Sequence, residues 1–472
     1  MTRVTRTASA VLVSSLLSLG QAVVEAQSRP PNIVVIVADD MGYADVGFQG
    51  SRDIPTPNID AIARGGIRFT DAYVSGPYCS PTRAGLMTGK YPQRFGHEFN
   101  PADNPEFGLP LDQTTMADRL KAAGYRTALF GKWHLGSAAP LHPMERGFDE
   151  FFGFLDGDHS YFDPATGGPV FDGRKPIKNM GYLTEELADR AVDFIERNRS
   201  QPFFLYLAFN AVHTPMDATE KYLSRFANIP DQERRTYAAM LSAMDDGIGR
   251  TMAALRAAGL EESSLIFFFS DNGGPTMATT TINGSSNAPL RGSKRQTWEG
   301  GIRVPFAILW KGHLAAGQTD SRPIIQLDVL PTALAAAGVD VRPEWKLDGV
   351  NLLPFLTGKQ AATPHDALYW RLGGMMAIRR GDWKLVKTRE GALRDVDPGV
   401  LSDLSTGELY NLKDDIGERK NLAAVHPEKV KELSEAWWQW NRELVRPLWT
   451  PRTGARVRDS LRVGAVPEIV RR

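Results

Sequence analysis

The sequence has 472 residues, of which 42% are hydrophobic and 23% are charged. A chain of this length and composition can bury one large core and a smaller appended unit. The 55 Lys and Arg residues balance the 55 Asp and Glu residues, so the formal net charge is zero. This balance argues against nucleic acid or an anionic membrane surface as a partner, although a local positive pocket remains compatible with it.

Residues 1–26 have the pattern of an export signal. Arg3 and Arg6 form a basic start, residues 8–19 form a short apolar stretch diluted by Ser, and V-E-A at 24–26 fits a cleavage site. The apolar stretch is too short to span a bilayer, and no other segment approaches that length. The sequence therefore predicts a secreted or periplasmic protein without a membrane span. The alternative is an ordinary unstructured N-terminus.

The body of the chain alternates strand-like and helix-like segments. Runs of β-branched and aromatic residues predict buried strands at 32–38, 125–130, 203–209 and 265–270. Helical patterns accompany them at 59–64, 116–123, 185–197 and 235–258. This alternation predicts an α/β domain with a mostly parallel sheet flanked by helices.

Polar residues follow each of the four predicted strands. They are, in chain order, Asp39-Asp40, Lys132 with His134, His213, and Asp271-Asn272. In open α/β sheets, ligands bind beyond the carboxyl ends of the strands. These residues are therefore expected to meet in one site.

The pattern changes after about residue 365. A hairpin turning at Gly381-Asp382, a further strand and a Trp-rich amphipathic helix are predicted at 376–387, 407–412 and 427–444. We therefore expect a catalytic α/β domain at 30–365. A small C-terminal α+β subdomain with an antiparallel sheet, a helix and a tail is expected at 366–472.

The chain contains a single cysteine, Cys79, so no intramolecular disulfide can form. Ser80 suits a helix N-cap and Pro81 the first helical position, which would place Cys79 at a helix N-terminus that favours an anion. Arg83, one turn later, adds a guanidinium suited to a tetrahedral oxyanion. The residues alone allow two interpretations: a nucleophile in an anion pocket, or a structural cysteine beside a capped helix.

The segment C-S-P-T-R at 79–83 resembles the C-x-P-[ST]-R signature of the type I, formylglycine-dependent sulfatases. Other segments resemble family motifs in the same order, namely G-K-W-H-L-G at 131–136, R-G-F-D-E-F-F-G at 146–153, S-D-N-G-G at 270–274, L-R-G-S-K at 290–294 and W-E-G-G-I-R-V-P at 298–305. The resemblance spans roughly residues 30–420 and is similar in character to the arylsulfatase and N-acetylgalactosamine-sulfatase branch. It implies an alkaline-phosphatase-like fold and a sulfuric ester hydrolase.

The resemblance also implies the chemistry of the site. A formylglycine-generating enzyme would oxidise Cys79 to an aldehyde, whose hydrate supplies the nucleophile and a second hydroxyl that expels sulfate. One divalent cation would be bound by Asp39, Asp40, Asp271, Asn272 and Cys79. The hard oxygens of this set favour Ca²⁺, with Mg²⁺ as the alternative, over zinc. Taken alone, Asp39-Asp40 fits a helix cap or a solvated turn equally well.

Roles for the remaining residues follow from the same resemblance. Lys132 would steady the formylglycine hydrate, and His134 would accept the proton of its second hydroxyl. His213 and Lys294 would contact sulfate oxygens, and one of them would protonate the leaving alcohol. The alternatives are that His213 is a packed histidine and that Lys294 belongs to an exposed basic loop.

Residues 145–181 are rich in Gly, Asp and aromatic residues and show little periodicity, which predicts loops over the active edge. Asp158 and His159 in this segment are candidate substrate-recognition residues. An Asx-rich surface turn explains them equally well.

Two other functions stay open at this point. One is a formylglycine-dependent phosphonate or phosphate ester hydrolase of the same superfamily, and the other is a non-catalytic sulfated-glycan binder. A binder would be expected to have lost Cys79, Lys132 or His134, which are all present. The resemblance favours a sulfated carbohydrate or aryl sulfate as the substrate, and the single cysteine favours a bacterial periplasm.

Overall fold

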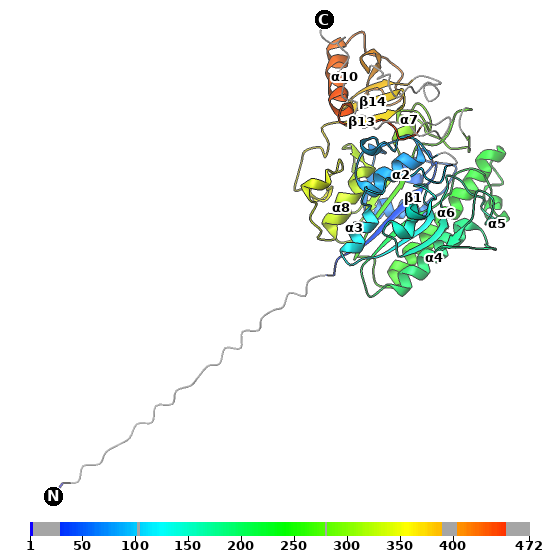
Figure 1. Cartoon of the computed structure of the whole chain (residues 1–472), viewed down its shortest axis with the longest axis vertical. Coiled ribbons are helices and arrows are strands. Elements are labelled where there is room, and N and C mark those ends of the chain that lie inside the picture. The colour runs from blue at the N-terminus through cyan, green and yellow to red at the C-terminus, as the bar shows by residue number, and fades with distance from the viewer. Residues whose placement is uncertain (3–28, 102–103, 279–280, 389–403, 450–472) are drawn as a thin grey trace.

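The computed structural model describes residues 1–2, 29–101, 104–278, 281–388 and 404–449. An α/β body carries a smaller layer, built from the C-terminal part of the chain, at one end (Figure 1). Apart from its first two residues, the predicted export signal lies outside the described residues, as does the predicted tail from residue 450 onward. Within the described ranges, no helix is long and apolar enough to cross a membrane.

Ten strands of the described chain form the central sheet. Their bounds are β1 Asn32–Ala38, β2 Ile67–Phe69, β4 Arg126–Lys132, β5 Glu150–Phe154, β6 Phe171–Asp172, β7 Lys175–Pro176, β8 Phe203–Ala208, β9 Ser264–Ser270, β10 Phe306–Leu309 and β11 Gln318–Asp320. The strand order is β11-β2-β10-β9-β1-β8-β4-β5-β6-β7. Strands β9, β1, β8, β4 and β5 are mutually parallel and form the middle of the sheet. The predicted mostly parallel sheet is confirmed.

Helices cover both faces of this sheet. The helices of the body are α1 Pro57–Gly65, α2 Cys79–Thr88, α3 Met116–Ala122, α4 Leu183–Arg197, α5 Glu220–Leu223, α6 Gln232–Ala257, α7 Glu299–Ile302, α8 Val329–Ala336 and α9 Leu353–Leu356. Val34 of β1 packs in one core with α1, α4 and α6, whereas its neighbour Val35 packs in a second core with α2, α3 and α8. Because β1 is buried on both faces, its sequence is a continuous apolar run rather than an alternating one.

The C-terminal layer is a four-stranded antiparallel sheet with one long helix. Its elements are β13 Leu368–Leu372, β14 Met375–Arg380, β15 Trp383–Lys387, β16 Glu408–Asn411 and α10 Pro427–Asn441. Strands β14 and β15 form the predicted hairpin, with Arg380 paired to Trp383 across the turn. The layer shares an apolar cluster with Tyr73 and Trp298 of the body. Tyr73 belongs to a small two-stranded sheet of β3 Ala72–Tyr73 and β12 Ile324–Ile325.

Residues 145–181 contain the predicted loops at the edge of the site and, in addition, three strands that were not predicted. Strand β5 pairs in parallel with β4, and β6 and β7 extend the sheet beyond it. The sequence of β5 is E-F-F-G-F, a short aromatic run without alternation, so its strand signal is weak. Gly153 interrupts this aromatic run. Glycine is required at this position because a Cβ would lie 2.0 Å from the carbonyl oxygen of Gly131. The remainder of the segment is loop that reaches the edge of the site.

Candidate active site

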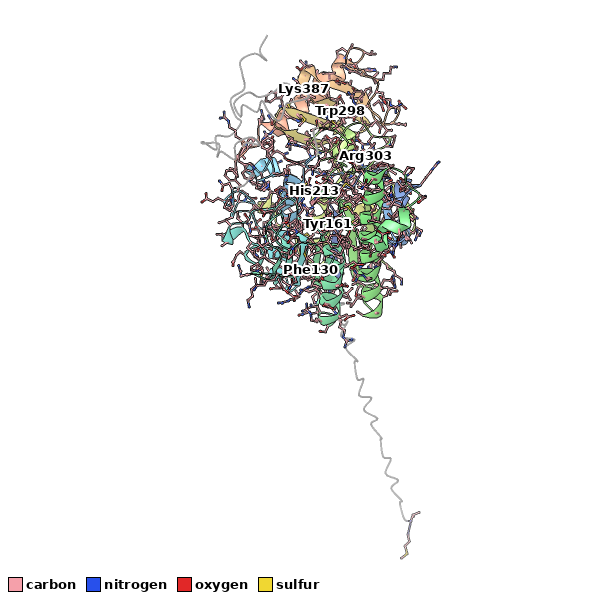
Figure 2. All side chains as sticks on the ribbon, turned by 90° about the vertical axis from the view of Figure 1, so that its right-hand side faces the viewer. Phe130, Tyr161, His213, Trp298, Arg303 and Lys387 are labelled. Atoms are coloured by element: carbon pink, nitrogen blue, oxygen red, sulfur yellow. The ribbon has the colours of Figure 1, made fainter. Side chains whose placement is uncertain are left out.

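The carboxyl ends of four parallel strands bring the predicted polar residues together. Asp39 and Asp40 follow β1, Lys132 ends β4, His213 follows β8, and Asp271 follows β9. All five side chains are buried. Along the long axis of the molecule, His213 lies between Phe130 of the body and Lys387 of the C-terminal sheet (Figure 2).

Cys79 is the first residue of α2, and Tyr78 is the N-cap. The predicted cap is therefore wrong: the helix begins before Ser80, and Pro81 is not its first residue. The Ser80 hydroxyl instead donates to the carbonyl oxygen of His134 at 2.6 Å and lies 2.6 Å from Nε2 of His97. The Ser80 hydroxyl, which was expected to cap the helix, thus contacts residues that are distant in the sequence. Cys79 nevertheless stands at a helix N-terminus, as expected.

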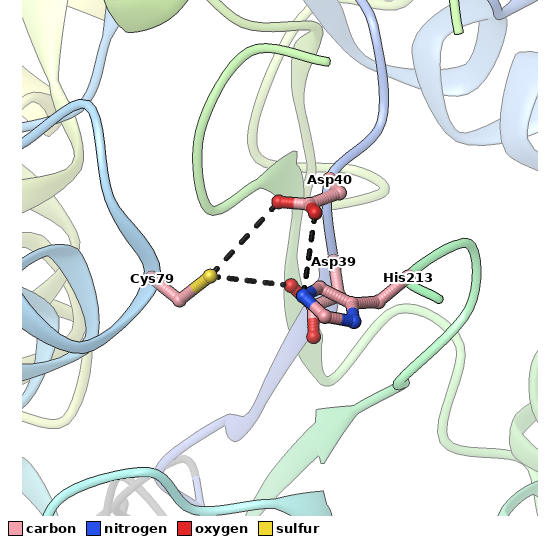
Figure 3. Close-up of side chains that lie close together, drawn as sticks. All are labelled: Asp39, Asp40, Cys79 and His213. Carbon is pink, nitrogen blue, oxygen red and sulfur yellow. Dashed lines mark hydrogen bonds and ion pairs between the residues drawn. The ribbon is translucent and has the colours of Figure 1, made fainter. Parts of the chain in front are cut away.

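Two ion pairs place lysines against the paired carboxylates beside Cys79. Lys132 Nζ lies 2.5 Å from Asp39 Oδ2, and Lys294 Nζ lies 2.7 Å from Asp40 Oδ2. Cys79 Sγ is 3.6 Å from Asp39 Oδ1 and 3.9 Å from Asp40 Oδ1 (Figure 3). One potential ligand atom from each of Asp39, Asp40, Cys79 and His213 lies within 4.8 Å of the others. The cluster has the composition and the spacing of a metal site.

Arg83 holds Asp271 at the base of this cluster. Its Nε and Nη2 lie 3.0 and 2.7 Å from Asp271 Oδ2, and Nη2 is 3.7 Å from Asp39 Oδ2. The other oxygen of Asp271 accepts a hydrogen bond from the backbone N–H of Asp40 at 3.2 Å. Both oxygens of Asp271 thus accept hydrogen bonds within the protein. The four residues whose potential ligand atoms lie within 4.8 Å of one another include His213 and not Asp271.

Asn272 has an unpaired oxygen at the same place. Its Nδ2 donates to Asp40 Oδ1 at 2.7 Å, whereas its Oδ1 is buried and has no hydrogen-bond partner in the described part of the chain. A buried carbonyl oxygen without a partner is costly, and such an atom calls for a ligand. An amide oxygen beside two carboxylates is the donor set that Ca²⁺ and Mg²⁺ prefer.

The charges in the cluster stabilise one another. Burial opposes ionisation of Asp39, but Lys132, His213 and Arg83 outweigh it and lower the pKa of this carboxyl below its usual value. Burial likewise opposes the charge on Lys132, yet Asp39 keeps the pKa of the lysine above its usual value. Burial raises the pKa of the Cys79 thiol far above its usual range, so the unmodified side chain is a neutral thiol and a poor nucleophile.

The pKa values of His134 and His213 both lie below the ordinary value of an imidazole. Burial, together with Lys132 and Arg83, lowers the pKa of His134 well below its usual value, and burial with Lys294 lowers that of His213. His134 has a left-handed backbone (φ 58°), and its Nδ1 is buried without a partner among the described residues. Nδ1 of His213 is 2.6 Å from the carbonyl oxygen of Thr214, whereas Nε2 is 3.4 Å from Asp40 Oδ2.

A cavity of about 580 Å³ opens onto these histidines. His134, His213 and Lys294 belong to its lining, with Tyr78 and Arg295 beside them. Lys294 Nζ and the Arg295 guanidinium lie 5.7 and 5.2 Å from the centre of the Tyr78 ring, within range of cation–π attraction. The cavity therefore reaches His213 and Lys294, the two side chains that lie against Asp40.

The two candidate substrate residues differ in their positions. Asp158 is exposed on the wall of the cavity. His159 is buried, and its Nδ1 and Nε2 lie 2.7 and 2.9 Å from the carbonyl oxygens of Ser160 and Gly168. The role of His159 as a substrate contact stays a prediction, and in this structure its ring lies against carbonyl oxygens of its own loop.

Other residues support the site without having been predicted. Asn283 Nδ2 lies 3.2 Å from the carbonyl oxygen of Asp40 and 2.9 Å from that of Val212. The Tyr161 hydroxyl lies 2.8 and 2.9 Å from the carbonyl oxygens of Asn210 and His213. Both side chains hold backbone from distant segments, a role that leaves no local pattern in the sequence.

Comparison with known proteins assigns this arrangement to a family. The family model described as Sulfatase matches residues 31–339. The chain belongs to the sulfatase family. This sulfatase is 34% identical to human arylsulfatase A over 455 residues, which cover 87% of each chain. It is also 34% identical to mouse N-acetylgalactosamine-6-sulfatase over 381 residues, which cover 75% of this chain and 72% of the mouse protein.

Solved structures agree with this assignment. Ps i-CgsB superposes with a TM-score of 0.82 at 37% identity, covering 90% of this chain and 96% of its own. The phosphonate monoester hydrolase of Agrobacterium radiobacter superposes with a TM-score of 0.62 at 20% identity, covering 87% and 95%, which shows a shared fold alone. The predicted alkaline-phosphatase-like class and the predicted sulfuric ester hydrolase activity are confirmed.

Proposed function

We propose that this sulfatase hydrolyses sulfate esters of a sulfated carbohydrate, using a formylglycine made from Cys79 and one divalent cation. The observation that carries the proposal is the position of Cys79, a neutral thiol at a helix N-terminus whose Sγ lies 3.6 and 3.9 Å from carboxylate oxygens of Asp39 and Asp40. As a thiol it is a weak nucleophile, so oxidation by a formylglycine-generating enzyme gives the position its chemistry. Once formed, the aldehyde hydrate supplies a hydroxyl that attacks sulfur.

The residues around Cys79 fit a hard divalent cation. Asp39 and Asp40 offer carboxylate oxygens, and Asn272 offers the buried amide oxygen for which the described part of the chain supplies no partner. Asp271 completes the ligand set expected from the sequence, and Ca²⁺ is the proposed ion, with Mg²⁺ as the alternative. When bound, the cation supplies positive charge that stabilises anionic oxygens next to position 79.

Arg83, Lys132 and Lys294 have separate tasks in this proposal. Arg83 is committed to Asp271 and Asp39, so it fixes the carboxylates beneath the nucleophile. The ammonium groups of Lys132 and Lys294 lie against Asp39 and Asp40 and present N–H donors near position 79. We assign Lys294, which lines the cavity, to the sulfate oxygens and Lys132, which is fully buried, to the nucleophile.

The two histidines move protons. His134 is neutral and its Nδ1 has no hydrogen-bond partner among the described residues, so this atom can accept a proton at position 79. His213 uses Nδ1 on the carbonyl oxygen of Thr214, which leaves Nε2 as the atom that exchanges a proton with the leaving alcohol. Each histidine lines the cavity, within reach of a bound substrate.

A sulfated carbohydrate is the proposed substrate class. Ps i-CgsB, 36% identical in this complex, has been solved with k-i-k-neocarrahexaose, and the mouse relative is named an N-acetylgalactosamine-6-sulfatase. The cavity wall also carries hydrogen-bonding side chains suited to sugar hydroxyls, among them Asn100, Asn104 and Asp158. We further propose a secreted or periplasmic location, which rests on the sequence pattern at residues 1–26.

Mass spectrometry of the tryptic peptide spanning residues 69–83 tests the modification. Protein from a host that contains the modifying enzyme should show the aldehyde or its hydrate at Cys79, and iodoacetamide should leave the peptide unalkylated. Protein from a host without the enzyme is the matched control and should carry an alkylated thiol. Only the first preparation should hydrolyse 4-methylumbelliferyl sulfate and release sulfate from sulfated oligosaccharides. An unmodified thiol in an active preparation would overturn the mechanism.

A further inference from the structure

The cavity is lined by charges of both signs. Lys294 and Arg295 contribute positive charge beside Tyr78, as described above. The turn after β5 contributes Asp156 and Asp158, and Asp158 is exposed. A carboxylate is an unexpected lining for a cavity that receives an anionic substrate, because it repels sulfate. Its presence therefore calls for an explanation in terms of what else the substrate carries.

The turn that carries Asp158 is packed directly onto a catalytic histidine. A Cβ added to Gly157 would lie 2.8 Å from both Cε1 and Nε2 of His134. The backbone of the turn is therefore in close contact with the imidazole ring. Asp158, the next residue, lines the same cavity as His134 and Lys294, so a sugar bound in this cavity can contact it.

Residues 159–168, which follow Asp158, also pack against this turn. His159 is buried and engages the carbonyl oxygens of Ser160 and Gly168, and a Cβ at Gly167 would lie 2.8 Å from the carbonyl oxygen of Asp158. Gly167 adopts φ 95°, a conformation that favours glycine. The contacts of His159 and of the Gly167-Gly168 turn position the backbone of Asp158 at the cavity wall.

We propose that Asp158 is a specificity-determining residue that accepts hydrogen bonds from free hydroxyls of the sugar carrying the scissile sulfate and repels a second sulfate on that sugar. A carboxylate binds vicinal hydroxyls through its acceptor oxygens, whereas a sulfate at the same place offers no donor and adds like charge. The enzyme then prefers a monosulfated sugar over its disulfated counterpart. This inference rests on the proposed function and names the substrate class of the same site.

Competition against 4-methylumbelliferyl sulfate turnover tests the inference whether or not a given sugar is cleaved. The probes are N-acetylgalactosamine 6-sulfate with its 4,6-disulfate, and galactose 6-sulfate with its 2,6-disulfate. The wild-type enzyme should be inhibited more strongly by the monosulfate of at least one pair. In Asp158→Asn the ratio of the two inhibition constants should shift toward the disulfate by about tenfold, as expected for loss of one nearby like charge.

Two variants separate a local effect from a general change of charge. Asp217→Asn removes an exposed carboxylate that does not line the cavity and should leave the wild-type ratio unchanged. Asp158→Glu keeps the charge and should retain the monosulfate preference. An unshifted ratio in Asp158→Asn, a shift of equal size in Asp217→Asn, or no competition by any of the four sugars would overturn the inference. Absence of aryl sulfate turnover by enzyme with aldehyde at Cys79 would instead overturn the proposed function.

Discussion

Two buried clusters of charge in this molecule differ in their access to a cavity. At the junction with the C-terminal sheet, Lys384 Nζ lies 2.8 Å from Glu299 Oε1 and 2.8 Å from Glu418 Oε1, and the three side chains have no exposed surface. The other oxygen of Glu299 lies 2.7 Å from the Tyr73 hydroxyl and 3.2 Å from Arg303 Nη1. We call these residues the junction network. Each of its charges meets an opposite charge within the protein.

The active-site cluster is equally buried but incomplete. Asn272 Oδ1 and His134 Nδ1 have no partner within the described ranges, and the cluster opens onto a cavity. Buried polar groups are costly when unpaired. Glu418 Oε1 of the junction network also has no hydrogen-bond partner among the described residues, so neither an unpaired atom nor a buried charge alone identifies an active site. What distinguishes the active site is that its cluster reaches a cavity.

Replacement of the nucleophile should have the largest effect. In Cys79→Ala, kcat/KM for any sulfate ester should fall by at least about 10⁴-fold, because no hydroxyl is left to attack sulfur. The buried site should still fold, so circular dichroism and the melting temperature should stay near those of the wild type. Residual turnover above a hundredth of the wild-type rate would contradict the assignment of Cys79.

Breaking the junction network should cost stability rather than chemistry. Lys384→Met leaves Glu299 and Glu418 without their shared cation and should lower the free energy of unfolding by about 3–5 kcal/mol. Denaturant unfolding measures this change, and kcat of the folded fraction should stay within about twofold of wild type. If kcat collapsed while stability held, the junction network would have to be counted as part of the active site.

The two clusters should respond differently to a divalent cation. Ca²⁺ added to chelator-treated protein should raise the free energy of unfolding by about 3 kcal/mol at saturating concentration, because the ion binds the folded state alone. Asn272→Ala should weaken this gain, since it removes the unpaired oxygen, whereas Lys384→Met should retain the full gain. Thermal shift against Ca²⁺ concentration gives the comparison. An undiminished gain in Asn272→Ala would remove this oxygen from the ligand set.

Gly157→Ala probes the packing over His134. The new methyl group would lie 2.8 Å from the imidazole, so the ring must move, and kcat should fall by about a hundredfold with little loss of stability. Gly181→Ala is the matched control, because its methyl group would meet only the flexible end of the Glu186 side chain at 3.0 Å. Steady-state kinetics of the two variants should diverge, and equal kcat values would show that His134 tolerates the shift.

The junction network should also produce the smallest of these effects, a pH dependence of stability. Burial raises the pKa of Glu418 to about 7 from an ordinary 4.5, despite Lys384. The folded state therefore holds this proton more tightly than the unfolded state, and the contribution of Glu418 to stability falls as pH rises from about 4.5 to about 7.

Glu418→Gln removes that titration. Its free energy of unfolding should decline less than that of wild type between these pH values, by on the order of 2 kcal/mol. Urea unfolding at the two ends of the window measures the difference. Glu435→Gln changes an exposed carboxylate on α10 and should reproduce the wild-type slope. A Glu418→Gln slope that matched the wild type would show that Glu418 ionises normally in the folded protein.

Much of the fold and the inner site was predictable because the physical causes are local. The continuous apolar run of β1 requires burial on both faces, and the residues after parallel strands share one edge of the sheet. The motif around Cys79, with Arg83 one turn later, is likewise contiguous. The sequence alone thus determined the α/β class and brought Asp39, Lys132 and Cys79 into one site.

Tertiary structure alone decided the details that depend on partners distant in the chain. Ser80 does not cap α2, because its hydroxyl contacts His97 and the carbonyl oxygen of His134. The ring of His159 lies against the carbonyl oxygens of Ser160 and Gly168. The unpaired oxygen of Asn272 is equally invisible in the sequence. Whether a buried polar atom is paired depends on every segment packed around it, and that information is not contained in any local pattern.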